Sequence, residues 1–279
     1  MSKDKKNSKL EKDAKKEKKK DKKPVKKSRR TNKPVRVISV DLWRTGLHME
    51  EIGIKKKEEL MSKSRQFTRN MDIIGEIKEK DSKKDNGIIA INQGVRDEKL
   101  ILKAFTGSIG WMGTLEETIA QEVSQSLALD RNFPAYVLII DKYEYILNLE
   151  KLFGGAGHSE KHHITIYHKD KTFDSFVIKE RRLGIGDDWN IVDEPDDVIA
   201  EIDGKKFDIG GQWDIKIYND DLAKHRAFVT AMILFCASRK YHKEVEKRIG
   251  KIIANKKKGI KFTLDHNELQ LYKNPRLRK

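Results

Sequence analysis

The chain has 279 residues and a formal net charge of +16, but 17 of its 60 Lys and Arg residues and only 5 of its 44 acidic residues lie in residues 1–33. The remainder is nearly balanced, so we attribute the high pI to a tail and expect no basic face on the fold. The single cysteine, Cys236, excludes an internal disulfide framework, and no apolar signal-peptide core lies at the N-terminus. These features predict an intracellular, cytoplasmic protein, with peripheral membrane association left open.

Residues 1–34 are dominated by lysine and almost free of apolar side chains, which predicts a disordered tail. Such a tail can contact the phosphates of nucleic acid or an anionic membrane surface. The alternative is a plain solubilising tail. The candidate anion-contacting residues are Lys18, Lys19, Lys20, Lys22, Lys23, Lys26, Lys27, Arg29 and Arg30.

Residues 35–98 are predicted to hold N-terminal strands and a linker. Residues 35–41 alternate and are rich in β-branched side chains, and residues 87–92 form a second short apolar run, so both are expected to be strands. The isoleucines at 73, 74 and 77 fit either a strand or a helical turn. The sequence leaves open whether residues 42–86 belong to a barrel or to a separate lobe.

A glycine-rich stretch, residues 107–113, follows a predicted strand at residues 99–105. Thr114 and Glu117 fit a capping box, and the four-residue recurrence of apolar positions predicts a helix over residues 115–129. Neither a P-loop nor a dinucleotide-binding motif is present, so we expect a tight turn rather than a nucleotide site.

A series of short alternating segments begins after Phe133. Their spacing of roughly ten residues, with turn residues between them, predicts an antiparallel meander of the kind found in sandwiches and barrels. The predicted strands are residues 135–141, 143–152, 163–168, 172–179, 189–192, 198–202, 206–209 and 213–218.

The segment Asp220–Gly250 is predicted to be one long helix, with Asp220 and Asp221 at its N-cap. Residues 227–237 are apolar on all sides but too few to cross a bilayer, which needs about 20, so we expect a buried helix and no transmembrane span. Its candidate core residues are Phe228, Met232, Ile233, Phe235 and Cys236. A meander that ends in such a helix predicts an α+β fold, an antiparallel β-barrel closed around a central C-terminal helix.

One spacing pattern near the predicted helix carries a family resemblance. It falls on Asp193, Val198–Ile202, Phe207, Trp213, Tyr218, Asp220, Asp221 and Phe228–Ala237. This pattern resembles the carboxyl end of the tubby-like superfamily, in particular the LURP-one-related and phospholipid-scramblase branch. The resemblance covers about Lys99–Lys240 and implies a twelve-stranded barrel around a central helix, which we place at residues 99–250.

The chain also departs from the family pattern. The helix continues into a C-terminal extension, residues 251–279, with a strand-like segment at residues 269–273. The cysteine-rich segment of the scramblases is absent, and no Lys/Arg pattern on a specific strand matches the family's phosphoinositide-binding residues.

The sequence offers weak candidates for metal binding and catalysis. Four histidines cluster between His158 and His168, but His162 and His163 are adjacent in a predicted strand and point to opposite faces. The acidic run from Asp187 to Asp197 fails the EF-hand spacing and is expected in solvated turns. No nucleophile motif is visible. We therefore expect no metal, no cofactor and no catalytic residue.

These observations predict a non-enzymatic binding or adaptor protein of tubby-like type. Its expected partner is an anionic, phosphoinositide-like membrane surface, with the Lys-rich tail adding electrostatic attraction. The alternative is a nucleic-acid-associated protein that uses the tail for non-specific phosphate contacts. A protein partner is also left open.

Overall fold

The computed structural model describes residues 33–42, 56–80, 86–152, 159–181, 187–205 and 211–273. The chain divides into two units, Met1–Lys33 and Pro34–Lys279, and all described strands and helices belong to the second. The basic tail with its anion-contacting candidates lies outside the described residues, as does the strand predicted at residues 206–209.

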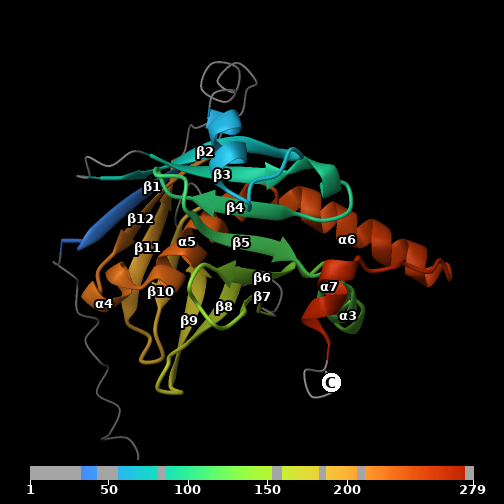
Figure 1. The fold of residues 1–279 in the computed structure, drawn as a ribbon. Coiled ribbons are helices and arrows are strands. Elements are labelled where there is room, and N and C mark those ends of the chain that lie inside the picture. The colour runs from blue at the N-terminus through green and yellow to red at the C-terminus, as the bar shows by residue number, and fades with distance from the viewer. Residues whose placement is uncertain are drawn as a thin grey trace, which may run out of the picture. The chain divides into compact units, whose positions relative to one another are not determined.

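Twelve antiparallel strands close into a barrel, as predicted (Figure 1). Each strand pairs with its neighbours in sequence, and β1 closes the wall by pairing with both β2 and β12. The strands are β1 Arg36–Leu42, β2 Met71–Glu79, β3 Gly87–Asn92, β4 Ile101–Phe105, β5 Trp111–Glu117, β6 Ala135–Ile140, β7 Leu147–Lys151, β8 Lys161–Tyr167, β9 Phe173–Glu180, β10 Trp189–Val192, β11 Val198–Gly204 and β12 Gln212–Ile217.

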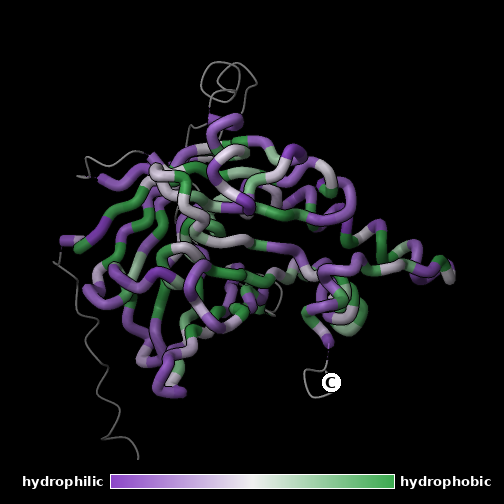
Figure 2. Tube along the Cα trace, viewed as in Figure 1, coloured by the Kyte–Doolittle hydropathy of each residue, from purple (hydrophilic) through white to green (hydrophobic). Residues whose placement is uncertain are grey.

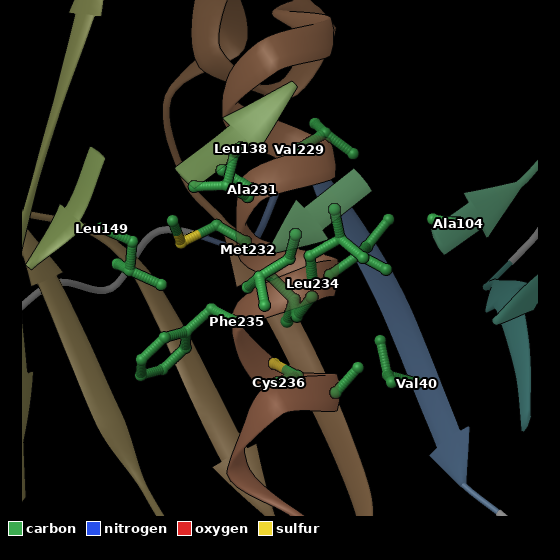
Figure 3. Close-up of a cluster of buried hydrophobic side chains, with 14 of the residues drawn as sticks. Val40, Ala104, Leu138, Leu149, Val229, Ala231, Met232, Leu234, Phe235 and Cys236 are labelled. Atoms are coloured by element: carbon green, nitrogen blue, oxygen red, sulfur yellow. The ribbon is translucent and has the colours of Figure 1, made fainter. Parts of the chain in front are cut away.

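The helix α5, Arg226–Arg239, fills the barrel. Every residue from Ala227 to Ser238 is buried, because inward side chains of the strands surround the helix on all sides. Figure 3 shows Met232 and Phe235 on the side of Leu149 in β7, and Leu234 on the side of Val40 in β1. The central helix is therefore the core of the barrel.

The prediction of one long helix over residues 220–250 is wrong, because three helices occupy this stretch. They are α4 Asp220–Lys224, α5, and α6 His242–Lys257. His225 adopts an extended conformation and ends α4, and its side chain then accepts a hydrogen bond from Phe228 N at the start of α5. The predicted cap is also displaced, since the side chain of Asn219 accepts hydrogen bonds from the amides of Asp221 and Leu222.

The predicted start of the barrel at residue 99 is wrong, because β1, β2 and β3 complete its wall. The predicted capping box is wrong as well: residues 114–117 belong to β5, and helix α3, Ile119–Leu129, begins after them. Thr114 instead accepts a hydrogen bond from Trp111 Nε1 at 3.2 Å.

The strand-like segment at residues 269–273 is mostly helical. Helix α7, His266–Leu271, is capped by Asp265, which accepts hydrogen bonds from two amides of the first turn. In the part of the chain that the structure describes, no helix has both the length and the apolar character needed to cross a membrane. Figure 1 shows α3, α6 and α7 gathered at one end of the barrel.

Candidate functional site

The charge of the second unit is divided along the chain. Residues 241–279 hold 12 Lys and Arg against 4 acidic residues, a net of +8, whereas residues 34–240 hold 31 against 35, a net of −4. The near balance of the total therefore conceals a basic C-terminal part, in which the described residues 241–273 hold 9 Lys and Arg against 4 acidic residues. We call residues 241–273 the C-terminal arm.

The arm begins with α6, which is amphipathic. Val245 and Ile249 are fully buried in the main core, and Ile252 lies in a smaller apolar cluster with α3. On the exposed side, Lys243 and Lys247 stand four residues apart, the spacing that aligns side chains on one helix face. Lys251 continues this lysine stripe.

One buried and one exposed ion pair connect α6 to the end of the barrel. Arg248 Nε donates to Glu117 Oε1 at 3.3 Å, and its Nη2 forms a second contact with the same carboxylate, which has no exposed surface. Arg248 Nη1 also donates to the carbonyl oxygen of Arg96 at 3.0 Å. Arg96 in turn pairs with Glu244 of α6 at 3.0 Å. The lysine stripe is therefore held on a rigid support.

Beyond α6 the chain makes a tight turn. Gly259 has φ +79, with open space where a side chain would stand, and Ile260 N donates to Asn255 O at 3.0 Å. This left-handed glycine after the last turn is the usual way to end a helix by sharp reversal. Ile260 and Phe262 follow with 53% and 40% of their surface exposed.

We call Lys256, Lys257, Lys258, Ile260, Lys261 and Phe262 the C-terminal tip. Lys257 lies 3.5 Å from Asp130, and both side chains are largely exposed. The other three tip lysines have no ion-pair partner among the described residues. Figure 2 shows hydrophilic and hydrophobic residues intermixed along this end of the chain. The tip thus combines unpaired cations with apolar side chains in water.

Helix α7 folds back and supports the base of the tip. Glu268 Oε1 accepts a hydrogen bond from Ala120 N at 2.8 Å, and so caps α3. Asp265 and Glu116 both pair with the buried Lys99. Burial acts to raise the pKa of Asp265, but the hydrogen bond from Lys99 and the amides of α7 bring it below its usual range. Exposed apolar side chains on α3, on α7 and at the C-cap of α7 are Leu127, Leu129, Leu269 and Tyr272.

The predicted central-helix residues are structural. Phe228, Met232 and Cys236 have no exposed surface, and Ile233 and Phe235 have 1% each. Burial raises the pKa of the Cys236 thiol well above its usual value. None of these side chains is placed to meet a ligand from solvent.

The histidine candidates do not converge. His162 is buried beside Trp189 and Phe235, with its Nε2 2.8 Å from Glu160 Oε1, whereas His163 lies on the outer face next to Thr165. His168 pairs with Asp174 at 2.9 Å, and His158 lies outside the described residues. Within the described ranges, no group of three or more His, Cys, Asp or Glu is arranged to hold a metal ion.

Arg239 organises a further cluster where α5 leaves the barrel. Its guanidinium lies over the ring of Trp189 at 4.7 Å, and it donates to Glu160 at 3.0 Å and Asp187 at 3.4 Å. Burial, which outweighs the hydrogen bond to Glu160, lowers the pKa of His162 to about 4, so this histidine is neutral near pH 7. Lys151, 3.5 Å from Glu160, supplies a second cation, so the two carboxylates of the cluster face two cations at this end of the barrel.

The tip was missed by reasoning from the sequence, which assigned no role to residues 251–279. The sequence of this region does contain the residues of the tip, as three lysines, a glycine, and then Ile, Lys and Phe. The same sequence is also compatible with a solvated loop that folds its apolar residues inward. Only the structure distinguishes such a loop from a tip with exposed apolar side chains.

Comparisons of the chain with protein-family models, with curated proteins and with solved structures find no match. The resemblance to the tubby-like superfamily therefore stays a prediction.

Proposed function

We propose that this protein is a non-enzymatic binding or adaptor protein of tubby-like type that attaches to anionic membrane surfaces through its C-terminal tip. The Lys-rich tail adds electrostatic attraction. The observation that carries the proposal is the joining of four lysines to the exposed Ile260 and Phe262 at the end of a firmly anchored helix.

A membrane surface suits both halves of the tip. Lysines near an anionic leaflet contribute about 1 kcal/mol each. Apolar side chains beside them can enter the boundary between headgroups and acyl chains, where their burial is favourable. Nucleic acid would satisfy the lysines but would leave Ile260 exposed to water, so the tip favours the membrane.

The expected affinity is modest. Four lysines at about 1 kcal/mol each, with about 1 kcal/mol each for partial burial of Ile260 and Phe262, give roughly 6 kcal/mol. This corresponds to a dissociation constant on the order of tens of micromolar. Attachment through the tip alone is therefore reversible, and a second source of attraction such as the tail would strengthen it.

The test is a vesicle flotation assay of the full chain. Vesicles of phosphatidylcholine alone are compared with vesicles that contain about 30 mol% phosphatidylserine, since only the latter attract basic residues. We expect binding to the anionic vesicles only. Changing the four tip lysines to glutamine should weaken binding by about three orders of magnitude, since about 4 kcal/mol is lost.

Two further variants complete the test. Ile260→Asn with Phe262→Asn should also weaken binding at about 150 mM salt, because screening reduces the lysine contribution and leaves the apolar one. The matched control changes four exposed lysines elsewhere, Lys80, Lys142, Lys169 and Lys171, to glutamine and should bind as the parent does. Equal losses in the tip and control variants, or preferential binding to an oligonucleotide, would reject the membrane proposal.

A further inference from the structure

The wall of the barrel is open along half of β9. This strand pairs with β8 over the whole span from Phe173 to Lys179. It pairs with β10 only from Val177 onward, because β10 ends at Val192 and the chain turns away there. Figure 1 shows the β8–β9 and β10–β11 hairpins next to each other at this end of the barrel.

The open half of β9, residues 173–176, has backbone groups without a partner strand. Successive residues of an antiparallel strand direct their N–H and C=O groups to opposite sides. Two of these four residues therefore direct their N–H and C=O groups away from β8. Among the residues that the structure describes, no backbone hydrogen bond from the β10–β11 turn reaches them. An unpaired edge of this kind is a template for an added strand.

A cavity of about 290 Å³ lies alongside this open edge. Buried apolar side chains, Phe176, Ile199 and Leu222, form part of its lining. The remainder is strongly acidic, with carboxylates from β9, from the β10–β11 turn and from α4. These carboxylates are Asp174, Asp193, Glu194 and Asp221.

Two of the four carboxylates have hydrogen-bond partners. Asp174 pairs with His168 at 2.9 Å, and Asp193 Oδ1 accepts a hydrogen bond from Asp197 N at 2.7 Å. Glu194 and Asp221 have no cationic partner within the described part of the chain. The cavity therefore offers two uncommitted negative charges above an apolar floor.

We propose that the open half of β9 and the acidic cavity beside it form a binding site for an extended peptide segment of a partner protein that carries lysine or arginine. The backbone of the segment would add a strand to β9. The aliphatic stem of its basic side chain would rest on Phe176 and Leu222, and the charged head would reach Glu194 and Asp221. This site is independent of the C-terminal tip and of membrane binding.

The test measures the fluorescence anisotropy of a labelled hexapeptide of alternating valine and lysine against the full chain. The matched probe replaces each lysine with glutamate. We expect the basic peptide to bind and the acidic peptide to give no signal. Glu194→Gln with Asp221→Asn should weaken binding about fivefold, the loss of two exposed ion pairs.

The control variant, Asp97→Asn with Glu98→Gln, removes the same charge from an exposed turn elsewhere and should bind as the parent does. Glu194→Gln alone, at an exposed turn position, gives a second variant in which folding is not at risk. An equal loss of affinity in the control would show non-specific attraction and overturn the proposal.

Strand addition is tested separately with two N-methylated probes, each blocked at alternate amides. Only one of the two sets of amides can face β9, so one probe should lose binding and the other should retain it. Retention by both would exclude strand pairing. Light scattering would detect the alternative, in which the edge of β9 pairs with a second copy of the chain. Dimers of the parent that dissociate when the edge residue Ser175 is changed to lysine would show this pairing and would also overturn the proposal.

Discussion

At the scale of single residues, Glu122 and Glu117 form the least expected contact of the molecule. Both side chains are fully buried, on α3 and at the end of β5. Arg248 pairs with Glu117, and its charge also acts on Glu122. Glu122 Oε1 accepts a hydrogen bond from Ala135 N at 3.0 Å. Burial, together with the neighbouring charge of Glu117, raises the pKa of Glu122 well above its usual value. The cluster is therefore neutral overall when Glu122 keeps its proton.

This arrangement predicts a loss of stability at high pH. The folded protein binds a proton at Glu122 more tightly than the unfolded chain, so the stabilisation is complete below pH 4.5 and declines as pH rises toward the raised pKa. Glu122→Gln should keep the hydrogen bond to Ala135 and flatten this decline. Urea unfolding of the parent and the variant at several pH values above 4.5 measures this decline in stability.

The control for this experiment is Glu144→Gln, on an exposed side chain, which should follow the parent at every pH. Parallel pH profiles for the parent and Glu122→Gln would show that Glu122 ionises normally in the folded protein and would contradict the prediction.

At the scale of elements, the central helix is the strongest constraint. Met232 has no exposed surface and lies among apolar side chains on every side. Met232→Asp should prevent folding, since an unpaired buried charge costs several kcal/mol. Met232→Leu should cost less than about 1.5 kcal/mol. Thermal unfolding followed by circular dichroism distinguishes the two.

Met61→Asp is the matched control, because Met61 is 39% exposed on the short helix at residues 56–63. The same substitution there should change stability by about 0.5 kcal/mol or less. A Met232→Asp variant that unfolds at the temperature of the parent would be incompatible with the central helix.

Several elements could be predicted from the sequence because their patterns are unambiguous. Residues 227–237 are apolar all round and must be enclosed, and the short alternating strands after Phe133 leave few alternatives to a meander. Elements that depend on tertiary contacts could not be predicted. The break at His225 comes from the backbone leaving α4 to enter the barrel, which no local signal encodes.

The error at residues 114–117 has a similar cause. The sequence of these residues fits a capping box. However, the side chain of Glu117 is bound by Arg248, which is 131 residues away in the chain. The tip shows the same limit at the candidate site. Its lysines are visible in the sequence, whereas the exposure of Ile260 and Phe262 depends on how α7 folds back onto α3.

At the scale of the whole molecule, the C-terminal arm is part of the barrel's closure. Val245 and Ile249 of α6 complete the main core, and Arg248 neutralises the buried Glu117. Removing residues 241–279 should therefore lower the melting temperature by about 10 °C or more, since stranding one member of a buried ion pair alone costs about 3–5 kcal/mol. Differential scanning calorimetry measures the change.

A variant of the full chain in which Lys243, Lys247 and Lys251 become glutamine should melt close to the parent, because these side chains are exposed and lie on the opposite face of α6. If the shortened chain melted as the parent does, the arm would be an appendage, contrary to the packing of α6. The expected result would instead show that the C-terminal tip and the barrel unfold as one cooperative unit.

The position of α5 after β12 has a consequence for how the protein is made. The strands that form the wall span residues 36–217, and the helix that fills the wall follows them in the chain. A ribosome adding about 5–20 residues per second needs on the order of 10–40 s to pass from β1 to the end of α5. During that time the nascent strands have neither their closing partner nor their core. We therefore expect the growing chain to depend on chaperones that shield its apolar strand faces until the last quarter of the protein emerges.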